Sequence, residues 1–168
     1  MGRPPLRRWL IASLIAVLAP LWAGVIRAPR ASAATPTFVA GADGYVVSSK
    51  PTTSFGLSTT LQVVRSSSTS RTYLQFDVAG IATPVTAVTL RLYVTDKSAK
   101  AVSIAKTATS WTESTLLWNT APAATGPTIG SLSVKSTGWA QATLPAATIT
   151  ADGRYAFVLD IASSDTAV

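Results

Sequence analysis

Hydrophobic and polar residues alternate along two stretches of the chain, residues 73–78 and 88–95. The apolar positions, two residues apart, are Leu74, Phe76 and Val78 in the first stretch and Val88, Leu90, Leu92 and Val94 in the second. A period of two over six to eight residues is typical of a β-strand with one buried face. We therefore predict two strands whose polar residues point away from the core.

Weaker strand patterns recur through the rest of the chain, and none of it shows the sustained spacing of an amphipathic helix. The stretches concerned are residues 45–48, 61–65, 102–106, 131–134, 139–144 and 155–161. Clusters of Ser, Thr, Gly and Pro separate them, and Gly126-Pro127 is interpreted as a turn. About eight short strands without a helix predict an all-β fold, a β-sandwich of jelly-roll type.

The first 33 residues have the features of an export signal. Arg3, Arg7 and Arg8 form a basic start, residues 9–26 are uncharged and apolar, and residues 31–33 read Ala-Ser-Ala. We predict that residues 1–33 are a signal peptide and that residues 34–168 are one secreted domain. An uncleaved membrane anchor is the alternative, and the pair Arg7-Arg8 leaves the export route open.

The charge of the chain, +7, is concentrated in this leader. Beyond residue 33, nine basic residues face seven acidic ones, which leaves +2 and removes the main argument for a nucleic-acid partner. The chain has no cysteine and no histidine, so the common general base, the Ser-His nucleophile and the zinc site are excluded. We therefore expect no enzymatic activity and no membrane partner after cleavage of the signal.

One segment carries a distinctive motif. Trp111-Thr112-Glu113 is followed by Leu117-Trp118-Asn119 and by Pro122. With the segments around residues 42–46, 71–78 and 88–94, it resembles the DNRLRE domain, also described as carbohydrate-binding module family 96. The resemblance covers residue 42 to the C-terminus and implies a β-sandwich, an extracellular location and a binding role without catalysis.

The chain departs from this family in two respects. The segment that gives the family its name is not recognisable, and the sequence ends at Val168, where relatives usually continue into another strand. We therefore expect that the sandwich lacks its last strand, with an exposed sheet edge, or that it closes differently.

The binding residues are expected on one polar face of the sheet. If the two alternating strands are neighbours, their outward side chains form a basic and aromatic surface suited to an acidic glycan such as alginate, because arginine binds carboxylates and tyrosine offers a flat ring. The predicted carbohydrate-binding residues are Lys50, Arg65, Arg71, Tyr73, Gln75, Arg91 and Tyr93. An ordinary solvated sheet face is the alternative.

Two further groups have both a structural and a binding interpretation. Trp111, Glu113, Trp118 and Asn119 are interpreted as a motif that fixes a loop, although they could line a sugar site. Asp43 and Asp160 could hold a structural calcium ion, the one cofactor considered, or act in turns and strand caps.

The function predicted from the sequence is therefore that of a secreted, non-catalytic module that binds a polysaccharide. The alternatives are a structural or adhesive extracellular domain, and a truncated accessory domain of a polysaccharide-degrading enzyme.

Overall fold

The computed structural model describes residues 35–81 and 84–161, and all of them belong to one compact unit, Thr35–Val168. The predicted signal segment and the C-terminal end lie outside the described residues. The strands are β1 (Ala42–Val47), β2 (Val64–Arg65), β3 (Thr69–Val78), β4 (Val88–Val94), β5 (Val102–Thr107), β6 (Ala124–Leu132), β7 (Gly138–Leu144) and β8 (Gly153–Ile161). One turn of 3₁₀-helix, Ala146–Thr148, connects β7 to β8.

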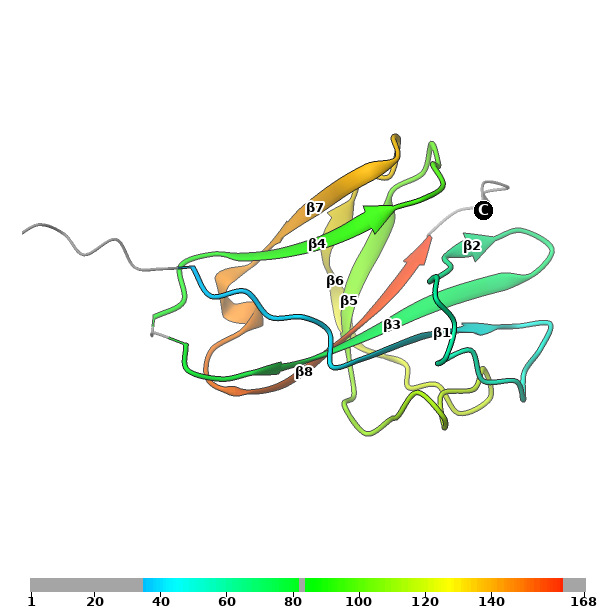
Figure 1. Cartoon of the computed structure of the whole chain (residues 1–168), viewed down its shortest axis with the longest axis horizontal. Coiled ribbons are helices and arrows are strands. Elements are labelled where there is room, and N and C mark those ends of the chain that lie inside the picture. The colour runs from blue at the N-terminus through cyan, green and yellow to red at the C-terminus, as the bar shows by residue number, and fades with distance from the viewer. Residues whose placement is uncertain (1–34, 82–83, 162–168) are drawn as a thin grey trace, which may run out of the picture. The chain divides into compact units, whose positions relative to one another are not determined.

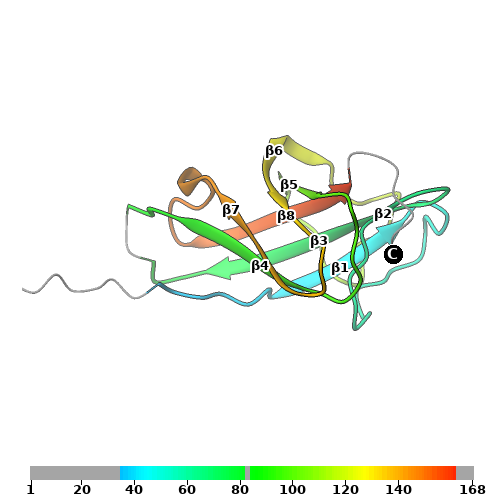
Figure 2. The same ribbon diagram turned by 90° about the horizontal axis from the view of Figure 1, so that it is seen from above.

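The strands form two antiparallel sheets. The larger has the order β1-β3-β8-β5-β6, with β2 paired to β3, and the smaller consists of β4 and β7. The small sheet covers one side of the large one (Figure 1), and a view from above shows β4 and β7 lying across β3 and β8 (Figure 2). The chain crosses between the sheets before and after β4 and again before and after β7, as in a jelly roll. The predicted β-sandwich is confirmed.

The main core lies between the two sheets. Alternate residues of β3 and β8 point into it, among them Leu74, Phe157 and Leu159, and Leu90 and Leu144 face them from the small sheet. Apolar burial of this kind is the main favourable contribution to folding. The inward set of β3 and β4 is the one that the alternation predicts.

A second core lies on the opposite side of the large sheet. Residues 108–123 connect β5 to β6 and run below the large sheet in Figure 1, on the side away from β4 and β7. Their Trp111 and Leu116 pack against Val46, Tyr73 and Val158 of the sheet. The large sheet is therefore buried on both sides in this region, which the alternation pattern does not predict.

The least accurate strand prediction concerns β6. We expected a strand at residues 131–134 and a turn at Gly126-Pro127, but β6 begins at Ala124 and contains both residues. β6 lies at the edge of the sheet, and its pairing with β5 shifts register twice. An edge strand tolerates proline because its outward N–H needs no partner in the sheet. Edge position also explains why most of β6 is exposed and lacks an apolar pattern.

Within the described residues, we find no helix of the length and apolar character needed to span a membrane.

Candidate functional site

The open outer face of the small sheet carries the most distinctive exposed residues of the protein. Cross-strand pairs place Arg91 opposite Gln141 and Tyr93 opposite Trp139. All four side chains are exposed, because Leu90, Ala142 and the other residues that alternate with them point into the core. We call Arg91, Tyr93, Trp139 and Gln141 the platform.

The platform is a set of side chains in mutual contact. Tyr93 and Trp139 meet edge to face, with ring centroids 5.5 Å apart and ring planes at 86°. The guanidinium carbon of Arg91 lies 4.7 Å from the centre of the Trp139 ring, within the range of a cation–π contact. These contacts hold the indole in place although Tyr93 remains 62% exposed and Trp139 67% exposed.

Contiguous exposed apolar patches rimmed by polar residues are typical of interaction sites, and Tyr93 and Trp139 form such a patch beside Arg91 and Gln141. The apolar face of a sugar ring can lie on an indole or phenol ring, and the amide of Gln141 and the guanidinium of Arg91 can bond to hydroxyls or carboxylates beside it. No ion pair involves Arg91 among the described residues, so its hydrogen-bond donors are available to a ligand.

The predicted binding residues of β3 lie on the other sheet, so Arg71 and Arg91 do not share a face. Tyr73 and Gln75 do point away from the main core, as predicted, but they are only 2% and 5% exposed. Both hold the covering loop: the Tyr73 hydroxyl donates to the carbonyl of Pro122 (3.1 Å), and Gln75 Nε2 donates to the carbonyl of Thr109 (2.8 Å). The expectation that Tyr73 and Gln75 lie on an open face is therefore wrong.

Arg65 and Arg71 are both engaged by one carboxylate. Arg65 donates to both oxygens of Asp160 (3.0 and 2.9 Å) and to the carbonyl of Ile161, and Arg71 Nε donates to Asp160 Oδ2 (2.9 Å). The guanidinium of Arg71 also lies 5.1 Å from the ring centre of Trp118. This cluster joins β2, β3 and β8 to the covering loop, and we interpret it as structural.

The motif segment holds the covering loop, residues 108–123, against β1 and the loop that follows it. Glu113 Oε1 accepts a hydrogen bond from the backbone of Asp43 (3.1 Å), and its backbone carbonyl accepts one from the hydroxyl of Ser54 (2.6 Å). Asn119 contributes its backbone N–H, which donates to Pro51 (3.2 Å). These contacts support the structural interpretation of Trp111, Glu113, Trp118 and Asn119.

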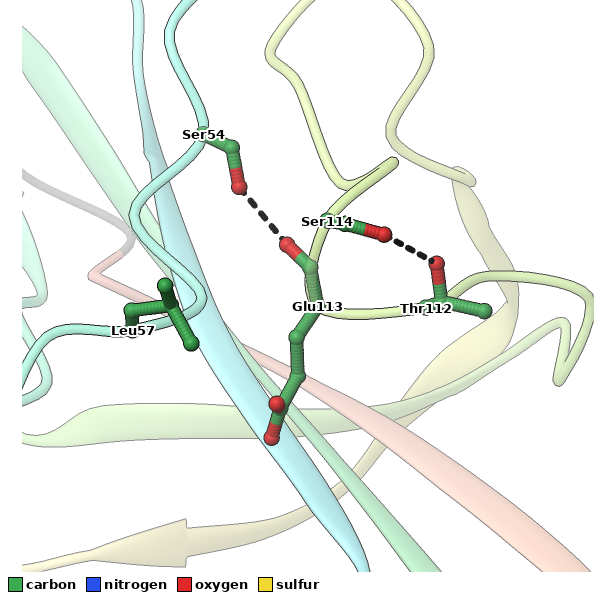
Figure 3. A pocket seen from close by; sticks show the side chains of 5 residues that line it. All are labelled: Ser54, Leu57, Thr112, Glu113 and Ser114. Carbon is green, nitrogen blue, oxygen red and sulfur yellow. Dashed lines mark hydrogen bonds between the residues drawn. The ribbon is translucent and has the colours of Figure 1, made fainter.

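An open hollow of about 440 Å³ lies beside Glu113, between the two loops. Its lining residues are Ser54, Leu57, Thr112, Glu113 and Ser114. Figure 3 shows that the Glu113 carboxylate points toward β1, while Ser54 bonds to the Glu113 backbone and Ser114 to Thr112. The polar groups that line the hollow thus bond to other groups of the protein. The hollow is therefore a weaker candidate site than the platform.

The structure does not bring Asp43 and Asp160 together. Asp43 pairs with Leu74 of β3. The Asp160 carboxylate instead binds Arg71, which is three residues from Leu74 along β3 and points to the other side of the sheet. Burial, and then the nearby Glu113 carboxylate, raise the pKa of Asp43. The described residues contain no group of three or more Asp, Glu, His or Cys that could hold a metal ion.

Lys50 lies in the loop after β1, with its ammonium 5.8 Å from the ring centre of Phe55, and is not part of the platform. Of the seven predicted binding residues, only Arg91 and Tyr93 are in the platform. Sequence reasoning missed Trp139 and Gln141, although a signal was present: Ala140, Ala142 and Leu144 alternate with them inside a predicted strand.

The fold is a β-sandwich whose small sheet presents two exposed aromatic rings, Tyr93 and Trp139, on its outer face. A model of carbohydrate-binding module family 96 matches residues 34–166, which is most of the chain. The chain therefore belongs to this family, as the motif at residues 111–122 indicates. A search of curated proteins gives no match.

Proposed function

We propose that the chain is a secreted, non-catalytic module that binds an acidic polysaccharide on the platform. The observation that carries this proposal is the pair of exposed rings, Tyr93 and Trp139, with Arg91 stacked on Trp139. Membership of a carbohydrate-binding family supplies the ligand class. The leader sequence supports export, and Arg91 favours carboxylate-bearing glycans such as alginate.

The geometry also indicates the form of the ligand. The two ring planes are nearly perpendicular, so both cannot lie flat on one planar crystalline surface. A single glycan chain can follow a curved path, with one ring on the Trp139 face and a neighbouring unit against Tyr93. We therefore propose soluble or gel-forming chains as ligands in preference to crystalline cellulose or chitin.

The test is binding of the purified protein to alginate, polygalacturonate, soluble neutral glucans and crystalline cellulose, with Trp139→Ala as the key variant. We expect a Kd at least tenfold higher for Trp139→Ala, because an exposed aromatic anchor is removed. Leu57→Ala is the matched control, since Leu57 is 95% exposed and lies outside the platform. Unchanged affinity in Trp139→Ala would refute the platform as the site.

The structural or adhesive alternative predicts a different result. A spacer or protein-contact domain would remain folded and bind none of these glycans, with or without calcium. Saturable binding that Trp139→Ala removes would exclude this alternative.

A further inference from the structure

The end of the small sheet nearest to the aromatic pair has an excess of positive charge. Lys97 and Lys100 lie in the turn after β4, and Lys135 lies in the turn before β7. Asp96 is the acidic residue of these two turns, and it is used locally, because its Oδ1 accepts the backbone N–H of Lys97 (2.9 Å). Three lysines and one aspartate leave a local charge of +2, and Arg91 adds another.

Two of these lysines border one hollow. It has a volume of about 460 Å³ and is lined by Lys97, Ser98, Ala99 and Lys135. The two turns are joined here, since the backbone N–H of Ser98 donates to the carbonyl of Val134 (2.9 Å). Within the first turn, the hydroxyl of Ser98 accepts the backbone N–H of Lys100 (2.9 Å). Ser98 is buried, so the base of the hollow is fixed by the fold while the lysine side chains remain exposed.

The hollow is close to the platform along the strands. Val94 pairs with Gly138 at the end of the small sheet, and Tyr93 and Trp139 form the next pair inward. Lys97 is four residues from Tyr93 and Lys135 four from Trp139. Four residues span at most about 14 Å, which a short oligosaccharide can bridge.

We infer that this hollow is an anion subsite of the glycan site. One sugar unit stacks at Tyr93 and Trp139, and Lys97 and Lys135 bind the carboxylate or sulfate of a flanking unit. This inference rests on the proposed function and adds to it the place on the protein where the anionic group of the glycan binds. Lysine binds an anion as a flexible point charge, so the subsite selects for charge at that position more than for one geometry.

The test compares one polymer in two charge states. Binding of the purified protein to polygalacturonate and to its fully methyl-esterified form is measured at low and at high ionic strength. We expect the double variant Lys97→Gln/Lys135→Gln to bind polygalacturonate about tenfold more weakly at low ionic strength and the ester as the unmodified protein does. Lys50→Gln/Lys106→Gln removes the same charge elsewhere and should retain both affinities.

A sulfated galactan and its desulfated form distinguish sulfate from carboxylate as the preferred anion. A larger effect of the double variant on the sulfated pair would assign the subsite to sulfate esters.

The possible failures are separable. If Trp139→Ala abolishes binding while Lys97→Gln/Lys135→Gln leaves the preference for polygalacturonate over its ester unchanged, the subsite is refuted and the platform stands. If Trp139→Ala has no effect on binding, the platform is not the glycan site and the proposed function is refuted. If the control pair Lys50→Gln/Lys106→Gln weakens binding equally, the effect is one of net charge and the subsite is refuted.

Discussion

The two outer faces of the sandwich carry almost the same arrangement of residues in two different environments. On the large sheet, Tyr73 meets Trp111 edge to face, with ring centroids 6.0 Å apart. On the small sheet, Tyr93 meets Trp139 in the same way, at 5.5 Å. Tyr73 and Trp111 are 2% and 6% exposed, whereas Tyr93 and Trp139 are 62% and 67% exposed.

The difference arises from one loop. Residues 108–123 cover the large sheet and supply Trp111, so the aromatic pair there becomes a core. On the small sheet both rings come from the strands themselves, and their exposure shows that no described residue covers them. A Tyr–Trp contact is therefore no indication of function by itself. It stabilises the fold where the chain covers it, and it is available to a ligand where the chain does not.

The sharpest test of this comparison is to remove one indole from each face. We expect Trp111→Ala to lower the free energy of unfolding by about 3–5 kcal/mol, because it leaves a cavity in the second core. Trp139→Ala should lower it by about 1 kcal/mol or less, the contribution of an exposed cross-strand aromatic pair. Denaturant unfolding measures both, and equal losses would show that the two faces are not different in kind.

Trp111→Phe refines this prediction. Trp111 Nε1 is buried and has no hydrogen-bond partner among the described residues. Phenylalanine keeps most of the apolar contact and removes an N–H whose burial is unfavourable. We therefore expect a much smaller loss of stability than in Trp111→Ala.

The second prediction concerns the close contact between Gly56 and the backbone of Glu113 in the covering loop. A Cβ at Gly56 would lie 2.3 Å from the carbonyl oxygen of Glu113, so the neighbouring loops must separate to admit it. We expect Gly56→Ala to lower the free energy of unfolding by about 1–3 kcal/mol. Gly126→Ala is the matched control: a Cβ there meets nothing within 4 Å, and β6 should accept it without loss. A neutral Gly56→Ala would contradict the contact.

In β3 and β4 the sequence predicts the side that faces the main core well and the other side poorly. The alternation at Leu74, Phe76 and Leu90 correctly gives the all-β fold and the residues of the main core. It also correctly assigns Tyr73 and Gln75 to the opposite side. Alternation does not reveal whether that side is covered, because cover comes from residues 108–123, which have no strand period of their own.

The same reason accounts for the errors in the candidate site. Arg71 and Arg91 were expected on one face if their strands were neighbours, but β3 and β4 lie in different sheets. Trp139 was missed because small residues, Ala140 and Ala142, form its inward neighbours and weaken the apolar signal. Sheet assignment depends on contacts distant in sequence, which periodicity does not contain.

The third prediction concerns the ion cluster formed by Arg65, Arg71 and Asp160. Asp160→Asn leaves Arg65 and Arg71 without their shared carboxylate, whose side chain is only 23% exposed. We expect a loss of about 1 kcal/mol in the free energy of unfolding. Asp77→Asn is the control, because its pair with Arg154 is more than half exposed and such pairs contribute little. Similar losses in the two variants would show that burial does not determine how much these ion pairs of the large sheet contribute to stability.

The smallest expected effect depends on pH and concerns Asp43. Burial, with the Glu113 carboxylate as a second cause, raises the pKa of Asp43 above its ordinary value of 3.8. The folded protein therefore binds a proton on this group more readily than the unfolded chain, so the unfavourable contribution of ionised Asp43 grows as the pH rises from 3.8 through the folded pKa. Asp43→Asn should thus be more stable than the unmodified protein at pH 7, by less than about 1 kcal/mol for a partly exposed group.

This gain should disappear below pH 3.8, where Asp43 is protonated in both states. Thermal unfolding of both proteins between pH 3 and 7 measures it. In a Glu113→Gln background the gain should shrink, because the amide oxygen can still accept the Asp43 N–H while the repulsive charge is gone. A gain that is independent of pH would show that the substitution acts through packing or hydrogen bonding. It would also show that repulsion between the Glu113 and Asp43 carboxylates does not destabilise the folded protein.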